Sequence, residues 1–194
     1  MGGHATDPQD HVVLLDDAGH PVGTAPRATV HTADTPLHLG FSCYLFRADG
    51  QVLVTRRALS KSTWPGVWTS SVCGHPRDGE SVGQAVRRHG RHELGVDVTA
   101  LELVLPSFRY RAVDAAGVVE NEVCPVLFGF ADGPPTPNPD EVLEARWVRM
   151  EDLEALVFLT PWMLSPWLVA QMDELLAAGM TTSRTRTPLT RAAG

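Results

Sequence analysis

Alternating apolar and polar residues predict several short strands in the first part of the chain. Residues 12–15 are apolar and precede Asp16-Asp17-Ala18-Gly19, a pattern typical of a strand and its turn. Residues 37–47 and 52–57 lie on either side of Ala48-Asp49-Gly50, where the Asp-Gly pair predicts a hairpin. In the first arm of this hairpin one face consists of Leu39, Phe41, Cys43 and Leu45, and the other of His38, Gly40, Ser42 and Tyr44.

Helical patterns are confined to a few segments. Residues 81–94 predict a helix that begins at a Ser81 cap and ends at Gly95. Residues 101–111 and 118–130 are apolar and β-branched, which predicts paired strands around a turn at 115–117. We further expect a proline-containing loop at 133–139, a strand at 145–149, a helix at 151–156 and an amphipathic helix at 166–179. Strands mixed with a few helices, without regular βαβ alternation, indicate a mixed α/β fold in which helices flank a mixed sheet.

Length and composition fit one folded domain. A chain of 194 residues, 43% hydrophobic and 20% charged, has enough apolar material for one well-buried core. We expect a loose leader at 1–10, a single domain at 11–180 and a disordered tail at 181–194, where the chain is polar and arginine-containing.

Charge, cysteines and hydropathy exclude several classes of function. The net charge of −7 argues against nucleic acid as the main partner. Three cysteines without disulfide spacing favour a reducing compartment. No apolar run approaches the ~20 residues of a membrane helix, and the first residues do not form a secretory signal. We therefore expect a cytoplasmic protein that binds neither nucleic acid nor membranes.

One loop and the helix after it carry a pattern of metal-binding chemistry. Gly74, Glu80, Arg88, Glu93 and Gly95 are spaced as in the Nudix box, where a glycine loop leads into a helix whose acidic face binds divalent cations. The plain alternative is an amphipathic surface helix with scattered charges. The box usually carries glutamates where this chain has histidines, at His89 and His92. Because hydrolysis of diphosphates usually needs several carboxylates there, we expect a site that binds metal but hydrolyses poorly.

Seven separate motifs, in order, resemble the type I isopentenyl-diphosphate isomerase family, a Nudix-fold family that does not hydrolyse its substrate. They run over nearly all of residues 12–171 and comprise His31-Thr32-Ala33-Asp34-Thr35-Pro36-Leu37-His38, Thr55-Arg56-Arg57-Ala58-Leu59-Ser60-Lys61, Trp64-Pro65-Gly66-Val67-Trp68-Thr69, Ser71-Val72-Cys73-Gly74-His75-Pro76, Tyr110-Arg111-Ala112, Glu120-Asn121-Glu122-Val123-Cys124-Pro125, and Thr160-Pro161-Trp162 with Ser165-Pro166-Trp167. The resemblance implies a Nudix-type α-β-α sandwich and a reversible shift of a double bond between isopentenyl and dimethylallyl diphosphate.

The resemblance also implies a catalytic pair, Cys73 and Glu122, which exchange protons with the two ends of the alkene. Which of them protonates in the forward direction stays open. A thiol suits this task because its ordinary pKa, ~8.5, is close to neutrality. The plain reading of a single cysteine is a small core residue, and we keep that reading for Cys43 and Cys124. Tyr110 is expected to hydrogen-bond Glu122 and assist its proton transfer.

By the same resemblance His31, His38, His75, Glu120 and Glu122 hold one divalent ion. Alternation along a strand places the two glutamates on one face, and this ligand set suits Zn²⁺ or Mn²⁺ better than Ca²⁺. Mg²⁺ is a third candidate for this site. Glu93 is expected to help hold a further Mg²⁺ that bridges to the substrate diphosphate. The other histidines considered, His4, His11 and His20, read as surface or satisfied core residues.

Basic and aromatic residues complete the expected substrate site. Arg57 and Lys61 are the expected diphosphate anchors, with Arg27 assisting, because guanidinium and ammonium groups bind phosphate oxygens through charge-assisted hydrogen bonds. Trp167 and Trp64 are expected to supply indole faces that would stabilise a carbocation by about 0.5–2 kcal/mol. A solvated basic loop and ordinary core tryptophans are the plain alternatives.

The leading hypothesis is therefore an isopentenyl-diphosphate isomerase that acts on a small prenyl diphosphate. The enzyme alternative is a Nudix hydrolase of a nucleoside or prenyl diphosphate, and a third reading is a metal-dependent binding module. Flavin is not expected, because the chemistry has no redox step and no dinucleotide fingerprint is present. The sequence leaves both a monomer and a homodimer open.

Overall fold

The computed structural model describes residues 10–180 and has the mixed α/β fold predicted from the sequence. It contains two mixed sheets rather than one central sheet. The expected tail at 181–194 and all of the expected leader except Asp10 lie outside the described residues. Within residues 10–180, no helix combines the length and the apolar character needed to cross a membrane.

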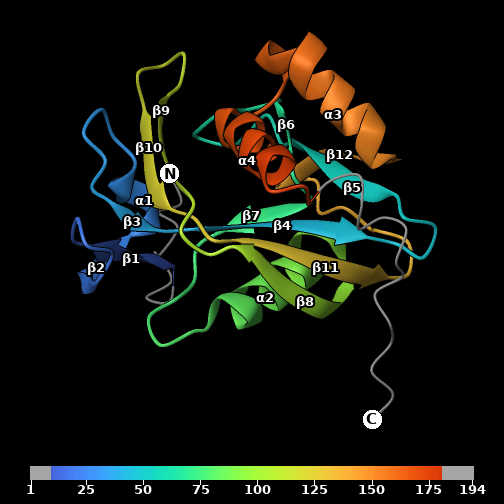
Figure 1. Ribbon diagram of the computed structural model, residues 1–194. Coiled ribbons are helices and arrows are strands. Elements are labelled where there is room, and N and C mark those ends of the chain that lie inside the picture. Colours follow the sequence, from blue (N-terminus) through green and yellow to red (C-terminus); the bar gives the residue numbers. More distant parts are fainter. Residues whose placement is uncertain (1–9, 181–194) are drawn as a thin grey trace.

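The smaller sheet has five strands in the order β2-β1-β3-β10-β9. Their bounds are β1 His11–Leu15, β2 Pro21–Pro26, β3 His38–Leu39, β9 Arg109–Val113 and β10 Val119–Val123. All neighbours are antiparallel except β3 and β10, which run parallel. Figure 1 shows this sheet at the left of the molecule, opposite α3, with β9 beside α4.

The larger sheet has seven strands, with the main order β12-β5-β4-β11-β8 and two short strands beside them. The bounds are β4 Phe41–Phe46, β5 Val52–Arg57, β6 Trp68–Thr69, β7 Val72–Gly74, β8 Asp97–Leu105, β11 Val126–Asp132 and β12 Val142–Val148. Strand β6 pairs with β5, and β7 pairs with β4. The predicted hairpin at 37–57 is present, although its arms pair only where Phe46 meets Val52.

Helices cover both faces of the larger sheet, as a sandwich requires (Figure 1). The helices are α1 Arg27–Val30, α2 Val82–Leu94, α3 Met150–Leu159, the 3-10 turn η1 Pro161–Met163, and α4 Pro166–Ala177. Helix α2 packs on one face over a core that includes Phe41, Cys43 and Leu45. Helices α3 and α4 pack on the other face, over a second core that includes Tyr44. The predicted division of the 37–47 strand into two faces is therefore confirmed.

The caps of α2 are those predicted from the sequence. The Ser81 side chain accepts a hydrogen bond from the backbone N–H of Gln84, and the Gln84 side chain accepts one from the backbone N–H of Ser81, which together form a capping box. Gly95 ends the helix in the left-handed conformation, at φ +64°. Helix α3 is longer than the predicted 151–156, and β12 begins three residues before the predicted strand at 145.

The predicted pairing of 101–111 with 118–130 around a turn is confirmed, although a break divides each arm. Each arm is broken into two strands: β8 and β9 on one side, β10 and β11 on the other. Strands β9 and β10 pair around the predicted turn in the smaller sheet, and β8 pairs with β11 beyond the break, in the larger sheet. The breaks contain Pro106 and Pro125, which cannot donate to a strand ladder.

The two sheets are joined by a pair of parallel chain segments. Strand β3 continues through Gly40 into β4, and β10 continues through Cys124 and Pro125 into β11. The pairing keeps the same offset across the break, because Glu122 pairs with His38 before it and Val126 pairs with Ser42 after it. Side chains on one face of these segments therefore pass from one sheet to the other without interruption. The candidate site lies at this junction.

Candidate active site

Three histidines and a glutamate from separate parts of the chain converge beside the smaller sheet. His31 follows α1, His38 lies on β3, His75 follows β7 and Glu120 lies on β10. One ligand atom from each lies within 4.8 Å of the corresponding atom of every other. Glu122 adjoins the group, with its Oε1 atom 3.0 Å from His75 Nε2 and 3.5 Å from His38 Nε2. The structure thus brings together all five residues expected to hold one divalent ion.

The geometry of this cluster fits a metal site. His38 Nδ1 lies 2.9 Å from the Pro36 carbonyl, to which it donates, so the other ring nitrogen, Nε2, faces the cluster. His38 Nε2 is only 3.2 Å from His75 Nε2. His31 Nε2 and Glu120 Oε2 are buried without a hydrogen bond, although they lie 3.1 Å apart. Buried polar atoms are rarely left without partners, and a cation shared by these atoms would satisfy them all.

Thr63 supports the cluster and was not predicted from the sequence. Its hydroxyl donates to Glu120 Oε1 at 2.8 Å, which leaves the other carboxylate oxygen to face His31. A hydrogen-bonded partner behind a ligand fixes that ligand's orientation. A threonine in a loop carries no sequence signal for this role, because only the fold brings Thr63 next to β10.

Glu122 sits at the junction of the two sheets, where Gly40 gives it room. A β-carbon added at Gly40 would lie 2.2 Å from Glu122 Oε2, so no side chain fits at residue 40 while the carboxylate stays in place. Burial by itself would raise the pKa of the Glu122 carboxyl. Hydrogen bonds from His38 and His75 outweigh this and hold that pKa well below its usual range. Glu122 is therefore an anion held between the imidazole rings of His38 and His75.

Tyr110 and Trp167 form an aromatic wall next to Glu122. Tyr110 on β9 pairs directly with Glu122 on β10, so their side chains leave the sheet on the same face. Burial, followed by the charge of Glu122, raises the pKa of the Tyr110 hydroxyl well above its usual value. The hydrogen bond expected between the Tyr110 hydroxyl and the Glu122 carboxylate is absent from the described part of the chain. The ring of Trp167 lies 5.7 Å from that of Tyr110, between centroids, and 5.5 Å from that of Trp64.

Cys73 lies on β7, directly across from Ser42 on β4. Its sulfur is 3.0 Å from Ser70 Oγ, 3.4 Å from Ser42 Oγ and 3.8 Å from Thr69 Oγ1. Ser42 Oγ is also 3.6 Å from the sulfur of Cys124, which follows β10 shortly after Glu122. The thiol and the Glu122 carboxylate are thus linked through adjacent side chains on one face of the junction.

Burial raises the pKa of the Cys73 thiol, and its neighbours act in the opposite direction. Hydrogen bonds with nearby hydroxyls and the positive charge of Arg57 both favour the thiolate. Cys43, by contrast, is enclosed in the core beneath α2, where burial raises the pKa of its thiol. Only Cys73 is partly exposed among the three free cysteines.

The loop and helix of the Nudix-like pattern are locked together by ion pairs. Arg88 on α2 donates to both carboxylate oxygens of Glu80, at 2.9 and 2.6 Å, and to the His75 carbonyl at 3.1 Å. His89 lies over Gly74, where an added β-carbon would come within 2.4 Å of the imidazole. His89 Nδ1 is 2.7 Å from Glu93 Oε1. The histidine that departs from the usual pattern therefore orients the one acid that remains.

The basic residues expected at the diphosphate are each engaged with another group. Arg57 donates to the Thr63 carbonyl at 2.8 Å, and its guanidinium lies 5.5 Å from the centroid of the Trp167 ring. Lys61 forms an ion pair with Glu141. Arg27 donates to Asp10 at 2.6 Å. Of these three, only Arg57 directly contacts the aromatic wall.

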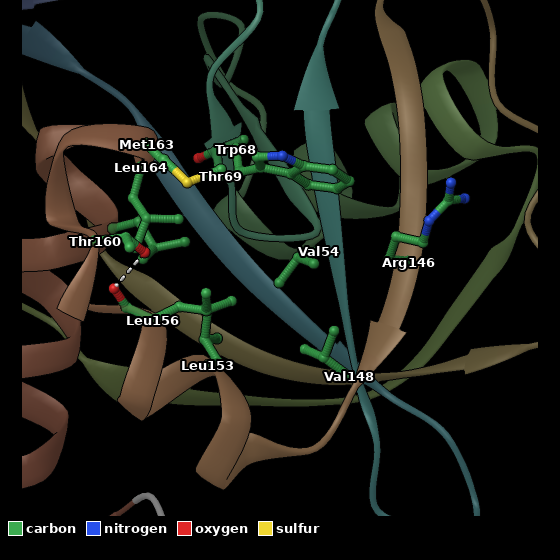
Figure 2. Close-up of a pocket in the computed structure, with 11 residues that line it drawn as sticks. Val54, Trp68, Thr69, Arg146, Val148, Leu153, Leu156, Thr160, Met163 and Leu164 are labelled. Carbon is green, nitrogen blue, oxygen red and sulfur yellow. Dashed lines mark hydrogen bonds between the residues drawn. The ribbon is translucent and has the colours of Figure 1, made fainter. Parts of the chain in front are cut away.

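A separate apolar cavity of about 210 Å³ lies under α3 and η1 (Figure 2). Its lining includes Val54, Leu153, Leu156 and Leu164, while Arg146 points away from the other labelled side chains. None of the predicted site residues lines it, although Thr69, a neighbour of Cys73, does. The cavity is therefore distinct from the candidate site.

Comparison with known folds places the chain among Nudix proteins. The model of the NUDIX domain matches residues 36–168. The solved structure of DR0079 from Deinococcus radiodurans is similar with a TM-score of 0.65, 21% identity and coverage of 84% of this chain and 98% of that one. A MutT protein from Methanosarcina mazei Go1 has a TM-score of 0.58 and 16% identity over 74% of this chain and 96% of that one. These likenesses establish the fold.

Curated relatives share far more of the sequence. A protein of Clavibacter michiganensis subsp. michiganensis, named isopentenyl-diphosphate Delta-isomerase, is 59% identical over 164 residues, 84% of each chain. A protein of the same name from Leifsonia xyli subsp. xyli is 55% identical, over 89% of this chain and 95% of that one. Another from Salmonella arizonae is 51% identical, over 86% of this chain and 91% of that one. The chain therefore belongs to the isopentenyl-diphosphate Delta-isomerase family of NUDIX-domain proteins.

Proposed function

We propose that this protein interconverts isopentenyl diphosphate and dimethylallyl diphosphate. The observation that carries the proposal is the junction of the two sheets, where a partly exposed thiol, Cys73, and a pinned carboxylate, Glu122, lie on one face beside an aromatic wall. Curated relatives at 51–59% identity carry the name of this activity. Isomerisation needs these groups and no redox cofactor.

The chemistry balances with two proton transfers. One of the pair Cys73 and Glu122 gives a proton to the terminal methylene carbon of isopentenyl diphosphate, which becomes a methyl group and leaves positive charge on the tertiary carbon. The other removes a proton from the carbon between that centre and the diphosphate-bearing carbon. The electrons of the broken C–H bond form the new double bond, so the substrate gains and loses one proton.

The aromatic wall would stabilise the charged intermediate. Indole faces attract cations by about 0.5–2 kcal/mol, more when water is excluded. Trp167 is buried and its ring plane is held by a hydrogen bond from Nε1 to Thr69 Oγ1 at 2.9 Å. Tyr110 lies between Trp167 and Glu122 and would assist proton transfer at that carboxylate.

Metal binding is supported by the unpartnered atoms of the histidine cluster. His31, His38, His75, Glu120 and Glu122 would hold one divalent ion, Mn²⁺, Zn²⁺ or Mg²⁺, and such an ion would fix Glu122 and tune its basicity. Glu93 would take part in holding a second ion, Mg²⁺, with the substrate diphosphate. Its Oε1 atom is held by His89.

Addition of Zn²⁺ or Mn²⁺ to metal-free protein is expected to raise the melting temperature. A ligand that binds only the folded state at 100 times its Kd adds about 2.7 kcal/mol, and here it would also relieve the crowded Nε2 atoms of His38 and His75. The measurement is a thermal melt with and without metal. His38→Ala should abolish the shift, whereas His20→Ala, at an exposed residue outside the cluster, should keep it. An equal shift in both variants would contradict the site.

Arg57, Lys61 and Arg27 would bind the diphosphate by exchanging partners. Arg57 now donates to loop carbonyls, while Lys61 and Arg27 pair with Glu141 and Asp10. A diphosphate offers more acceptor oxygens and charge than these groups. The aromatic side chains of Trp167, Tyr110 and Trp64 beside the site favour a small prenyl diphosphate over a nucleotide.

Hydrolysis of a nucleoside or prenyl diphosphate is the alternative, and the helix gives it less support. Two of the box positions that usually carry glutamate are His89 and His92, and only Glu93 supplies a carboxylate there. Purified protein with Mg²⁺ should convert isopentenyl diphosphate to dimethylallyl diphosphate without releasing phosphate. Phosphate release from a panel of diphosphates, with no isomerised product, would favour the hydrolase.

Gly40→Ala is expected to lower turnover about a hundredfold while leaving the protein folded. The new β-carbon would overlap Glu122 Oε2, and a displacement of a catalytic group by about 1 Å can cost 10²-fold. The measurement is kcat for isopentenyl diphosphate together with a thermal melt. Gly83→Ala is the matched control, because its β-carbon meets ordinary contacts from 3.4 Å on a helix. Full activity of Gly40→Ala would contradict the placement of Glu122.

We also propose that residues 11–180 form one isomerase domain and that the protein is cytoplasmic. Both sheets contribute to the site, which argues for a single unit. Free cysteines at three buried or partly buried positions fit a reducing compartment.

A further inference from the structure

A fully buried glutamine links the last long helix to the catalytic thiol. Gln171 lies on α4, beyond the residues matched by the NUDIX domain, and no part of it is exposed. Its Nε2 atom donates to Ser42 Oγ at 2.9 Å, and its Oε1 atom accepts from the Tyr44 hydroxyl at 3.0 Å. A buried amide in an apolar helix face is costly unless it has a specific role or full partners. Gln171 has partners that lead to Cys73.

The donors available fix the directions of the two hydrogen bonds made by Gln171. Among residues 10–180, the Tyr44 hydroxyl hydrogen-bonds to Gln171, so its hydrogen finds an acceptor only if Oε1 faces it. The amide NH₂ group must then donate to Ser42 Oγ. With a lone pair of Ser42 occupied in this way, its own hydrogen can point at Cys73 Sγ, 3.4 Å away, while the Cys124 thiol, with its sulfur 3.6 Å away, can donate to the Ser42 oxygen.

Thr69 reaches the same sulfur by a similar chain. The Trp167 indole can only donate, so Thr69 Oγ1 accepts from it. Ser165 Oγ accepts from the Leu168 backbone amide at 3.3 Å and lies 2.9 Å from Thr69 Oγ1, so that its hydroxyl can donate to Thr69. In that arrangement the Thr69 hydrogen is left for Cys73 Sγ, 3.8 Å away. Both chains begin on or beside α4 and end at hydroxyl groups that can donate to the thiol sulfur.

We propose that Ser42 and Gln171 are positioning residues for Cys73, which deepens the proposed isomerase function and rests on it. The chain Tyr44–Gln171–Ser42 holds a hydroxyl donor against the sulfur, so that the sulfur keeps its place and has a hydrogen-bond donor ready whenever its own proton is on the substrate. Preorganised donors of this kind avoid reorganisation during the reaction. Gln171 acts only through Ser42, and neither residue needs to touch the substrate.

The test compares Ser42→Ala, Gln171→Met and the double variant by kcat and KM for isopentenyl diphosphate with Mg²⁺. In other enzymes, removing one preorganised hydrogen-bond donor lowers kcat by about 10²–10³-fold. Because Ser70 and Thr69 would still contact the sulfur, we expect kcat to fall only about ten- to hundredfold in each single variant. KM should stay within about twofold. The double variant should lose no more than Ser42→Ala alone, because both changes break one chain.

Ser71→Ala is the matched control, since Ser71 is equally buried and hydrogen-bonds only to the backbone of Leu45 and Leu53. It should lower the melting temperature without lowering kcat. If Gln171→Met does not fold, Tyr44→Phe removes one oxygen and should lower kcat severalfold by releasing the amide. Single variants within twofold of the wild-type kcat, losses that multiply in the double variant, or an equal loss in Ser71→Ala would each overturn the proposal. An inactive wild-type protein would instead refute the isomerase function.

Discussion

Replacing Cys73 by alanine is expected to abolish isomerisation, with kcat falling by about 10⁴-fold or more. General acid–base groups contribute about 10²–10⁴-fold where they assist a reaction, and here the proton transfer to or from carbon is the reaction itself. No other thiol can substitute, because Cys43 and Cys124 are both buried. The measurement is the rate of dimethylallyl diphosphate formation by purified Cys73→Ala with Mg²⁺.

Cys43→Ala is the control for loss of a sulfur atom. Its side chain packs beneath α2 on the opposite face of β4 from Ser42. The change should cost about 1 kcal/mol of stability, as typical core substitutions do, and leave kcat near the wild-type value. Wild-type turnover by Cys73→Ala, with Cys43→Ala behaving as expected, would show that the assigned chemistry is wrong.

Glu122→Gln is expected to be as damaging, for two reasons that act together. The amide cannot take a proton at neutral pH, and it removes the negative charge that faces His38 and His75. Both proton transfer and metal binding should therefore suffer, with kcat lowered by about 10³-fold or more. The rate and the metal content of the purified variant measure the two effects separately.

The control for this change is Glu144→Gln, which alters a glutamate on β12 that pairs with Arg56 on β5 and with Arg146 on β12. Ion pairs of this partly exposed kind contribute little, about 0–1 kcal/mol, so activity and metal content should be unchanged. A Glu122→Gln variant with full metal content and full turnover would remove Glu122 from the mechanism.

Much of this site could be predicted from the sequence because its residues lie in compact motifs. His75 follows Cys73 by two residues, and Glu120 and Glu122 share one face of a strand by simple alternation. The caps of α2 were predictable for the same reason, since Ser81 and Gly95 act on their immediate neighbours. Contacts can be predicted from the sequence where the interacting residues are close together in the chain.

Contacts between distant segments were not predictable in the same way. Thr63 reaches Glu120 across 57 residues, and Gln171 reaches Ser42 across 129. A polar residue on the inner face of α4 was the one signal for Gln171, and such a residue has many possible partners. The split of the 101–130 hairpin was also missed, because β-branched runs predict strands but not the sheet that each half joins.

The most direct test of the central claim is proton exchange in deuterated water, followed by NMR with wild-type protein, Mg²⁺ and isopentenyl diphosphate. If Cys73 and Glu122 exchange protons with opposite ends of the alkene, deuterium should enter the new methyl group of dimethylallyl diphosphate and no phosphate should appear. Recovery of substrate or phosphate without any carbon-bound deuterium would contradict the account.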